Sequence, residues 1–275
     1  LAARRITSLT MDGIPRISRA QRMDALTSMS TVAGYRAVLD AAEYLPRFLP
    51  MVGTAIGAIK PATVLVVGAG VAGLQSIATA KRLGAVVKAW DIRESARQEA
   101  ASLGAKVEGF DVPADLAIAP GGYARQLPEE WLRKEQAAIG AIAAQADIII
   151  LSALVPGSLA PTIITEEIVA RMRPGSVIID ISIDQGGNCA LTKPGQDVWA
   201  HSVRICGVQN LPGRMPMQSS WLYANNMYYY IENLFKNGPG TPDFEDEIVR
   251  ASLVTTDGRI VYEPALEAMG ERVTV

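Results

Sequence analysis

The chain has 275 residues, of which 49% are hydrophobic and 20% are charged, so it can bury one large core or two modest ones. Its formal net charge is −2 at pH 7, without a long basic run, which disfavours nucleic acid or an anionic membrane as the main partner. The longest apolar stretches, such as residues 148–155, are too short to cross a bilayer, and we expect a soluble protein.

Residue types that hold metals or act as nucleophiles with a base are scarce. The chain has one histidine, His201, and two cysteines, Cys189 and Cys206. These are too few for most metal sites, for a Ser-His-Asp triad or for a disulfide framework. We therefore predict no metal site, a surface position for His201 and packed thiols for both cysteines. Any chemistry is expected to come from a bound cofactor.

The N-terminal region begins at Leu1 with neither an initiator methionine nor a signal-peptide pattern, and we expect that the sequence before it has been removed. Residues 23–44 have helical periodicity. Pro46, Pro50 and two glycines then interrupt the chain before the first predicted strand of the main domain.

From Lys60 onward, short runs rich in Val and Ile alternate with segments of helical period. The predicted strands are residues 64–67, 85–90, 106–112, 147–153, 176–181 and 203–209, and the predicted helices are residues 71–82, 93–102, 129–145 and 161–172, the last with Pro161 at its start. Strands that are apolar on both faces and alternate with helices indicate a parallel sheet covered on both sides. The predicted fold class is therefore α/β, with a Rossmann-type doubly wound parallel sheet.

The C-terminal region predicts one long helix over residues 219–235, followed at residues 236–242 by two glycines and two prolines, a linker composition. Two short strand-like pieces, residues 252–255 and 259–261, then flank the turn Asp257-Gly258. Both ends of the chain are too small to form a domain alone. We expect them to be the remnant of a second α/β domain.

The first predicted strand runs directly into Gly68-Ala69-Gly70-Val71-Ala72-Gly73, and a helix follows at once. In a dinucleotide-binding turn of this form, the first glycine permits the tight turn and the second lets the backbone approach a pyrophosphate. The third allows close packing of helix on strand. The helix N-terminus offers N–H groups and a positive dipole end to the anion. A plain structural turn is the alternative interpretation.

An acidic residue, Asp91, closes the next strand, 18 positions beyond Gly73. A carboxylate there can accept both hydroxyls of the adenosine ribose and repels a 2′-phosphate, which predicts NAD(H) rather than NADP(H). Arg93 complicates this prediction, because a nearby arginine can pair with a 2′-phosphate or stack on adenine. Asp91 could instead cap the following helix, or serve both purposes.

Six segments now resemble a known family when they are taken in order. They are residues 16–24 (RISRAQRMD), 68–75 (GAGVAGLQ), 80–85 (AKRLGA), 120–124 (PGGYA), 153–157 (ALVPG) and 186–189 (GGNC). Together they are similar to the NAD(H)-binding component, or alpha subunit, of proton-translocating NAD(P) transhydrogenase, a family related to alanine dehydrogenase. The similarity runs from about residue 15 to residue 264.

The resemblance implies a nucleotide site. Its catalytic residues would be Arg16, Gln21 and Asp24, on a segment that approaches the nicotinamide ring and its ribose, and Thr27 stands where the family usually has serine. The implied cofactor-binding residues are Thr27, Gly68, Gly70, Val71, Ala72, Gly73, Asp91, Ile92, Arg93, Gly122, Tyr123, Gln136 and Leu154, with residues 122–123 on a loop that closes over bound nucleotide. The simpler interpretations are a plain turn at residues 121–122, a surface aromatic at 123, a solvated helix position at 136 and a core leucine at 154.

The resemblance further implies an oxidoreductase that passes a hydride from NADH, bound here, to NADP⁺ on a partner component, which would bind NADP(H). Residues 1–25 would end a truncated N-terminal domain, residues 26–235 would form the NAD-binding Rossmann domain, and residues 236–275 would return to the first domain. The implied partners are the NADP(H)-binding component, a membrane proton-channel component and a second copy in a homodimer. The expected location is cytoplasmic, peripheral at the inner face of the membrane.

Two alternatives remain open. Asp184-Gln185-Gly186-Gly187 departs from the transhydrogenase pattern and resembles alanine dehydrogenase, in which the aspartate would serve as the acid–base group. Against that alternative, alanine dehydrogenase lacks the segment at residues 19–24. A non-catalytic NAD-binding module is the third possibility. Residues 215–221 and 228–230 could then form an interaction surface, although aromatic runs in a long helix more often serve core or dimer packing.

Overall fold

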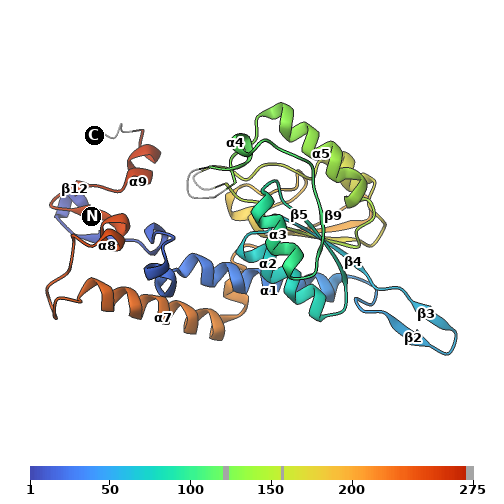
Figure 1. Ribbon diagram of the computed structural model, residues 1–275, viewed down its shortest axis with the longest axis horizontal. Helices are drawn as coiled ribbons and strands as arrows, with labels where there is room; N and C mark the ends of the chain where they lie inside the picture. The colour runs from blue at the N-terminus through green and yellow to red at the C-terminus, as the bar shows by residue number, and fades with distance from the viewer. Residues whose placement is uncertain (120–123, 156–157, 271–275) are drawn as a thin grey trace. The chain divides into compact units, whose positions relative to one another are not determined.

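The structure is a computed structural model that describes residues 1–119, 124–155 and 158–270 (Figure 1). The chain divides into two compact units. We call Thr31–Met215 the Rossmann unit, and Leu1–Ser30 together with Pro216–Val275 the terminal unit. The boundaries predicted at residues 25 and 235 stay predictions; in the structure, the long helix after residue 215 buries Tyr230 and Leu234 within the terminal unit.

The Rossmann unit is built on a seven-stranded sheet with the order β6-β5-β4-β7-β8-β10-β9. Its strands are β4 (Thr63–Val67), β5 (Val86–Trp90), β6 (Lys106–Glu108), β7 (Ile148–Leu151), β8 (Val177–Asp180), β9 (Asp197–Ala200) and β10 (Val203–Cys206). All neighbours pair in parallel except β9, which is antiparallel to β10. The predicted doubly wound parallel sheet is therefore confirmed, with one antiparallel edge strand added.

Helices cover both faces of this sheet (Figure 1). The helices of the Rossmann unit are α1 (Ala25–Tyr44, which begins in the terminal unit), α2 (Val71–Arg82), α3 (Glu94–Ser102), α4 (Ala114–Ala117), α5 (Glu129–Ala143) and α6 (Glu166–Ala170), with 3₁₀ segments η4 (Ile181–Gln185) and η5 (Leu211–Arg214). Val64 and Val66 of β4 share a buried cluster with α1, α2 and α3, whereas Leu65 and Val67 share one with α5 and α6. Alternate side chains of one strand thus feed two cores, as expected of a sheet buried on both faces.

One predicted helix is much shorter than expected. The prediction of a helix over residues 161–172 with Pro161 at its start is wrong, because α6 begins only after Thr165, whose side chain accepts the Ile168 N–H. The segment before it bonds to Asn188 instead: the N–H groups of Ile163 and Ile164 donate to its carbonyl, and its side-chain amide donates to the Pro161 carbonyl. A proline at the first helical position was a reasonable expectation that this non-local pairing overrides.

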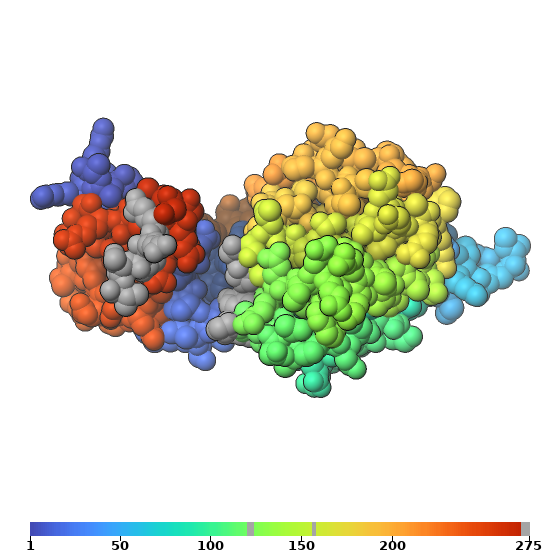
Figure 2. Space-filling model, turned by 90° about the horizontal axis from the view of Figure 1, so that it is seen from above, coloured from blue at the N-terminus to red at the C-terminus, as the bar shows by residue number. Residues whose placement is uncertain are grey.

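A β-hairpin, β2 (Val52–Thr54) paired with β3 (Gly57–Ile59), projects away from the rest of the Rossmann unit (Figures 1 and 2). Its turn carries Ile56, which is 99% exposed. The hairpin was not predicted, since its few residues include two glycines and bury little apolar surface.

The terminal unit joins the two ends of the chain. It contains η1 (Ala2–Arg4), β1 (Ser8–Leu9), η2 (Met11–Gly13), η3 (Ser18–Met23), α7 (Pro216–Leu234), α8 (Glu247–Ser252), β11 (Leu253–Thr256), β12 (Arg259–Ile260) and α9 (Glu263–Ala268). β1 pairs with β11, and β11 pairs with β12 around the predicted turn, in which Asp257 and Gly258 both have positive φ. Both chain ends therefore contribute to one small α/β body, as predicted. Across the described parts of both units, every helix is too short or too polar to span a membrane.

Candidate functional site

The glycine turn connects β4 to α2 at the carboxyl edge of the sheet. Gly68 has φ +87°, a conformation that favours glycine. A Cβ placed on Gly73 would lie 1.9 Å from the Gly68 carbonyl oxygen, so only glycine lets the helix come this close to the strand. Gly68 and Gly73 therefore satisfy the steric requirements predicted for the first and third positions of the motif.

Gly70 differs from the other two glycines, because a Cβ placed there would meet nothing within 4 Å. It stands at the N-cap of α2, where the first N–H groups of a helix have no partner within the helix. Open space thus lies beside the positive end of a 12-residue helix. This arrangement fits a pyrophosphate, which needs backbone donors and a close approach without an intervening side chain.

The turn lies where the sheet reverses its winding, because β4 has β5 on one side and β7 on the other. In sheets of this kind, ligands bind at the carboxyl ends of the strands at this point. A Cβ on Gly68 would be 2.7 Å from the Ala153 nitrogen, so the exit of β7 packs directly on the turn. The Asn188 side chain fixes that exit by accepting the Ala153 N–H (3.0 Å) and donating to the Ala153 carbonyl (2.8 Å). Leu154, the next residue, is 39% exposed and is not part of the core.

Asp91 follows β5 and is buried, with its carboxylate against the turn. Its Oδ2 accepts the Ala69 N–H at 2.8 Å, and its Oδ1 accepts the Arg93 N–H at 2.8 Å. The Arg93 guanidinium pairs with the same carboxylate, with Nη2 2.9 Å from Oδ2. Arg93 rather than Asp91 occupies the N-cap of α3, so Asp91 joins the ends of β4 and β5 instead of capping the helix. Ile92, between them, is half-buried.

One acidic residue of this region was not predicted from the sequence. Glu135 of α5 is buried and accepts the indole N–H of Trp90, the last residue of β5, at 2.9 Å. Burial raises the pKa of Glu135 to about 7, a rise that the Trp90 hydrogen bond opposes and the Asp91 charge reinforces. Glu135 lies four residues before Ile139, which is buried, and positions i and i+4 share a helix face. This spacing is the sequence signal that could have indicated the burial of Glu135. The neighbouring Gln136 donates to the Thr162 carbonyl at 2.7 Å, so this predicted nucleotide contact also joins α5 to the segment before α6.

The predicted catalytic segment belongs to the terminal unit. Arg16 and Gln21 are exposed, the latter on η3. Asp24 precedes α1, and its carboxylate accepts both the Thr27 N–H (2.8 Å) and the Thr27 hydroxyl (2.6 Å). This is the geometry of a helix N-cap. The structure thus brings Asp24 and Thr27 together, and gives both a structural role besides the predicted one.

The remaining predicted residues fall in several places. Gly122 and Tyr123 lie outside the described residues. Asp184, the acid–base group of the alanine dehydrogenase interpretation, is exposed on η4 and accepts from the Gln209 side chain at 3.1 Å. His201 is exposed and lies 3.2 Å from Glu166, as expected of a surface residue.

Both cysteines are buried free thiols, as predicted, and burial raises the pKa of Cys206 to about 12. In the part of the chain that the structure describes, no three His, Cys, Asp or Glu side chains are grouped to hold a metal ion.

Known proteins are similar to this chain in sequence and in fold. Residues 37–263 match the family described as alanine dehydrogenase/PNT, C-terminal domain. The first component of the NAD(P) transhydrogenase alpha subunit of Rhodospirillum rubrum is 47% identical over 273 residues, which cover 98% of this chain and 71% of that protein. The alanine dehydrogenase of Bacillus subtilis (strain 168) is 30% identical over 265 residues, which cover 92% of this chain and 64% of that protein. A crystal structure of transhydrogenase from Sinorhizobium meliloti is 40% identical with a TM-score of 0.82, over 94% of this chain and 70% of that one.

The family match covers most of the chain, including all of the glycine turn, Asp91 and α5. Similarity to the Rhodospirillum transhydrogenase subunit exceeds that to the Bacillus alanine dehydrogenase. The chain therefore belongs to the alanine dehydrogenase/PNT family, a family of oxidoreductases.

Proposed function

We propose that this chain is the NAD(H)-binding subunit of a proton-translocating NAD(P) transhydrogenase, which passes a hydride from NADH to NADP⁺ on a partner component. The observation that carries the proposal is the open space at Gly70, at the N-terminus of α2 and beside the Asp91 carboxylate. The similarity to transhydrogenase alpha subunits supports the same conclusion.

Val71, Ala72 and Gly73 would hold the pyrophosphate through their backbone N–H groups. Asp91 would accept the adenosine ribose hydroxyls, and its negative charge would oppose a 2′-phosphate. The two backbone N–H groups on Asp91 keep its carboxylate in place, whereas the Arg93 guanidinium is the partner that a ribose would displace. Ile92, Gln136 and Leu154 complete the proposed nucleotide contacts.

Bound NADH supplies the hydride from C4 of its nicotinamide. The work of the protein is to position that ring and exclude water, because the two nicotinamide carbons must come within about 3–3.5 Å. Arg16 and Gln21 would hold the ring by hydrogen bonds from their exposed side chains, and Asp24 would act from a carboxylate that Thr27 already orients. No acid or base on the chain is required.

The proposed assembly has an NADP(H)-binding component and a membrane proton-channel component, with this subunit peripheral at the cytoplasmic face. The names of the relatives, which describe them as alpha subunits or components of one, support a multi-subunit enzyme. A homodimer is part of the proposal. Exposed apolar residues at the β2–β3 hairpin support it, because Ile56 in its turn and Met51 just before β2 are largely uncovered in the single chain.

Alanine dehydrogenase is the second candidate, because Asp184 is exposed at the surface beside Gln185-Gly186-Gly187.

The deciding experiment adds a separately purified NADP-binding component and an NADP⁺ analogue to the protein with NADH. In parallel, NAD⁺ and L-alanine are supplied without that component. Reduction of the analogue only when the component is present supports the transhydrogenase. Alanine-dependent NADH formation would replace it with the second candidate, and NADH binding with neither reaction would favour a non-catalytic module.

A further inference from the structure

We propose that Asp246, acting through Arg19, is a positioning residue for hydride transfer, because it fixes the 3₁₀ segment that carries Gln21. This inference rests on the proposed function, in which Gln21 orients the nicotinamide ring. All of the groups involved lie in the terminal unit.

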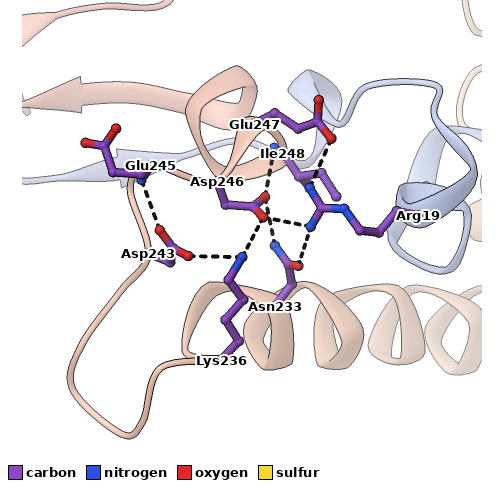
Figure 3. Close-up of polar contacts among 8 residues, drawn as sticks. All are labelled: Arg19, Asn233, Lys236, Asp243, Glu245, Asp246, Glu247 and Ile248. Carbon is purple, nitrogen blue, oxygen red and sulfur yellow. Dashed lines mark hydrogen bonds and ion pairs between the residues drawn. The ribbon is translucent and has the colours of Figure 1, made fainter.

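Asp246 collects donors from three parts of the chain (Figure 3). Its Oδ2 accepts from Arg19 Nη1 at 2.7 Å and from Lys236 Nζ at 2.9 Å. Its Oδ1 accepts from Asn233 Nδ2 at 3.2 Å and from the Ile248 N–H at 2.9 Å, which caps α8. The Asp246 side chain is only 3% exposed, so the carboxylate is a fixed point to which α7, α8 and η3 are all attached.

Arg19 is the link from this fixed point to η3, two residues before Gln21 in the sequence. Besides Asp246, its guanidinium donates to Asn233 Oδ1 at 3.1 Å and to Glu247 at 3.1 Å. Figure 3 shows the guanidinium reaching from η3 across to α7 and α8, with its bonds spread over acceptors from both helices. A planar group with several fixed donors sets both the position and the rotation of the segment that bears it.

Another face of η3 is held by packing. Ala20 and Met23 are buried with Tyr230 of α7 and with Ile248 of α8. Asn226 of α7 donates to the Arg22 carbonyl at 2.9 Å. Packing and the Arg19 bonds therefore restrain the same turn while the Gln21 side chain remains exposed.

The charge balance keeps the Asp246 carboxylate ionised at neutral pH. Burial alone would raise the pKa of Asp246, but hydrogen bonds from Arg19, Lys236 and Asn233 hold it well below its usual range. Lys236 also pairs with Asp243 at 3.0 Å. Asp246 thus remains charged and paired even when Arg19 is replaced, so the replacement leaves no buried charge without a partner.

Lys236 provides a matched control for Arg19. Both cations pair with Oδ2 of Asp246, and the side chains of Lys236 and Arg19 are 44% and 45% exposed, respectively. Lys236 follows α7 and makes no bond to η3 among the described contacts. Arg19→Ala and Lys236→Ala therefore remove the same charge from the same carboxylate, but only the first releases the segment that carries Gln21.

The test uses the intact protein with its NADP-binding component. Amide hydrogen exchange of residues 16–24 is measured without nucleotide, and NADH affinity and hydride transfer at saturating NADH are measured separately. Arg19→Ala is expected to speed exchange in this segment and to slow transfer by about tenfold or more, with NADH affinity changed less than threefold. Lys236→Ala is expected to change neither exchange nor transfer. Arg19→Lys, which keeps a cation beside Asp246, is expected to recover part of the loss.

Equal effects of Arg19→Ala and Lys236→Ala on transfer would overturn the inference, because the role would then be general stability. Unchanged exchange and transfer in Arg19→Ala would also overturn it. If the unmodified protein transfers no hydride, the proposed function fails instead, and the exchange measurement still decides whether Arg19 fixes the segment.

Discussion

The buried carboxyl of Glu135 makes a quantitative prediction about stability. In the folded protein its pKa is raised from 4.5 to about 7, chiefly by burial. The folded state therefore holds a proton on Glu135 at pH values where the unfolded chain has lost it. Stability from this group is fully present below pH 4.5 and is lost as the pH rises through about 7.

The size of the effect follows from the two pKa values. Each pKa unit is worth about 1.4 kcal/mol. The rise of the Glu135 pKa from 4.5 to about 7 therefore lowers the free energy of unfolding by roughly 3 kcal/mol between pH 4 and pH 8. Glu135→Gln keeps a carbonyl oxygen for the Trp90 indole N–H but does not titrate. At pH 8 the variant should be more stable than the parent, and the advantage should disappear near pH 4.5.

The assay is urea unfolding of both proteins at intervals from pH 4.5 to 8.5, followed by Trp fluorescence. The difference between the two proteins isolates Glu135, since all other titrating groups are shared. A difference that stays constant across this range would refute the reasoning, because it would mean that Glu135 ionises in the folded state as it does in water. Glu130→Gln, at an exposed position of the same helix, is the control. The difference in unfolding free energy between this variant and the parent should show no comparable change near pH 7.

Other predictions concern the nucleotide site. Gly70→Ala should fold with unchanged Tm, since the φ of −79° at this position suits alanine. Calorimetry should show that the variant binds NADH about tenfold or more weakly, and an unchanged affinity would mean that the pyrophosphate does not bind at this turn. Gly73→Ala should lose about 1–3 kcal/mol of stability in the same unfolding assay, because its Cβ would strike the Gly68 carbonyl, and an unaltered midpoint would contradict this packing. Asp91→Ala should lower the NADH-to-NADPH affinity ratio; the ratio is the proper readout, since loss of the Ala69 bond harms both nucleotides equally. Gln21→Asn should slow hydride transfer far more than it weakens NADH binding, and equal losses would make Gln21 a binding residue only.

Local patterns predicted the first half of the Rossmann unit well. The strand at residues 64–67, the glycine turn and the helix at 71–82 match β4, the turn and α2 almost residue for residue. A short apolar run and closely spaced glycines specify these elements through contacts near in sequence. β9 was missed because it is an edge strand with half of its residues exposed, so it lacks the apolar run that marks a buried strand.

The site was predictable only where its residues act through the backbone or through a recognised motif. Asp91 was identified by its position at the end of β5, and its alternative role as a helix cap was wrong. The sequence did not single out Glu135, whose burial depends on the non-local contact with the Trp90 indole. The bond between Arg19 and Asp246 joins residues 227 positions apart, and such a pairing leaves no local signal. Asp24 is predicted as a catalytic residue and Thr27 as a cofactor contact, and neither prediction includes the helix cap, although a short acidic side chain before a helix is a standard capping pattern.

Isotope labelling tests whether the hydride passes directly from NADH to the NADP⁺ analogue. NADH carrying deuterium at the transferable C4 position is mixed with the protein, the NADP-binding component and an NADP⁺ analogue, and the reduced analogue is examined by mass spectrometry. Direct transfer would place one deuterium on the reduced analogue, with none lost to solvent, and no reduction would occur when either protein is omitted. Recovery of unlabelled product, or of unchanged NADH in the complete mixture, would contradict direct hydride transfer from a nucleotide bound to this chain.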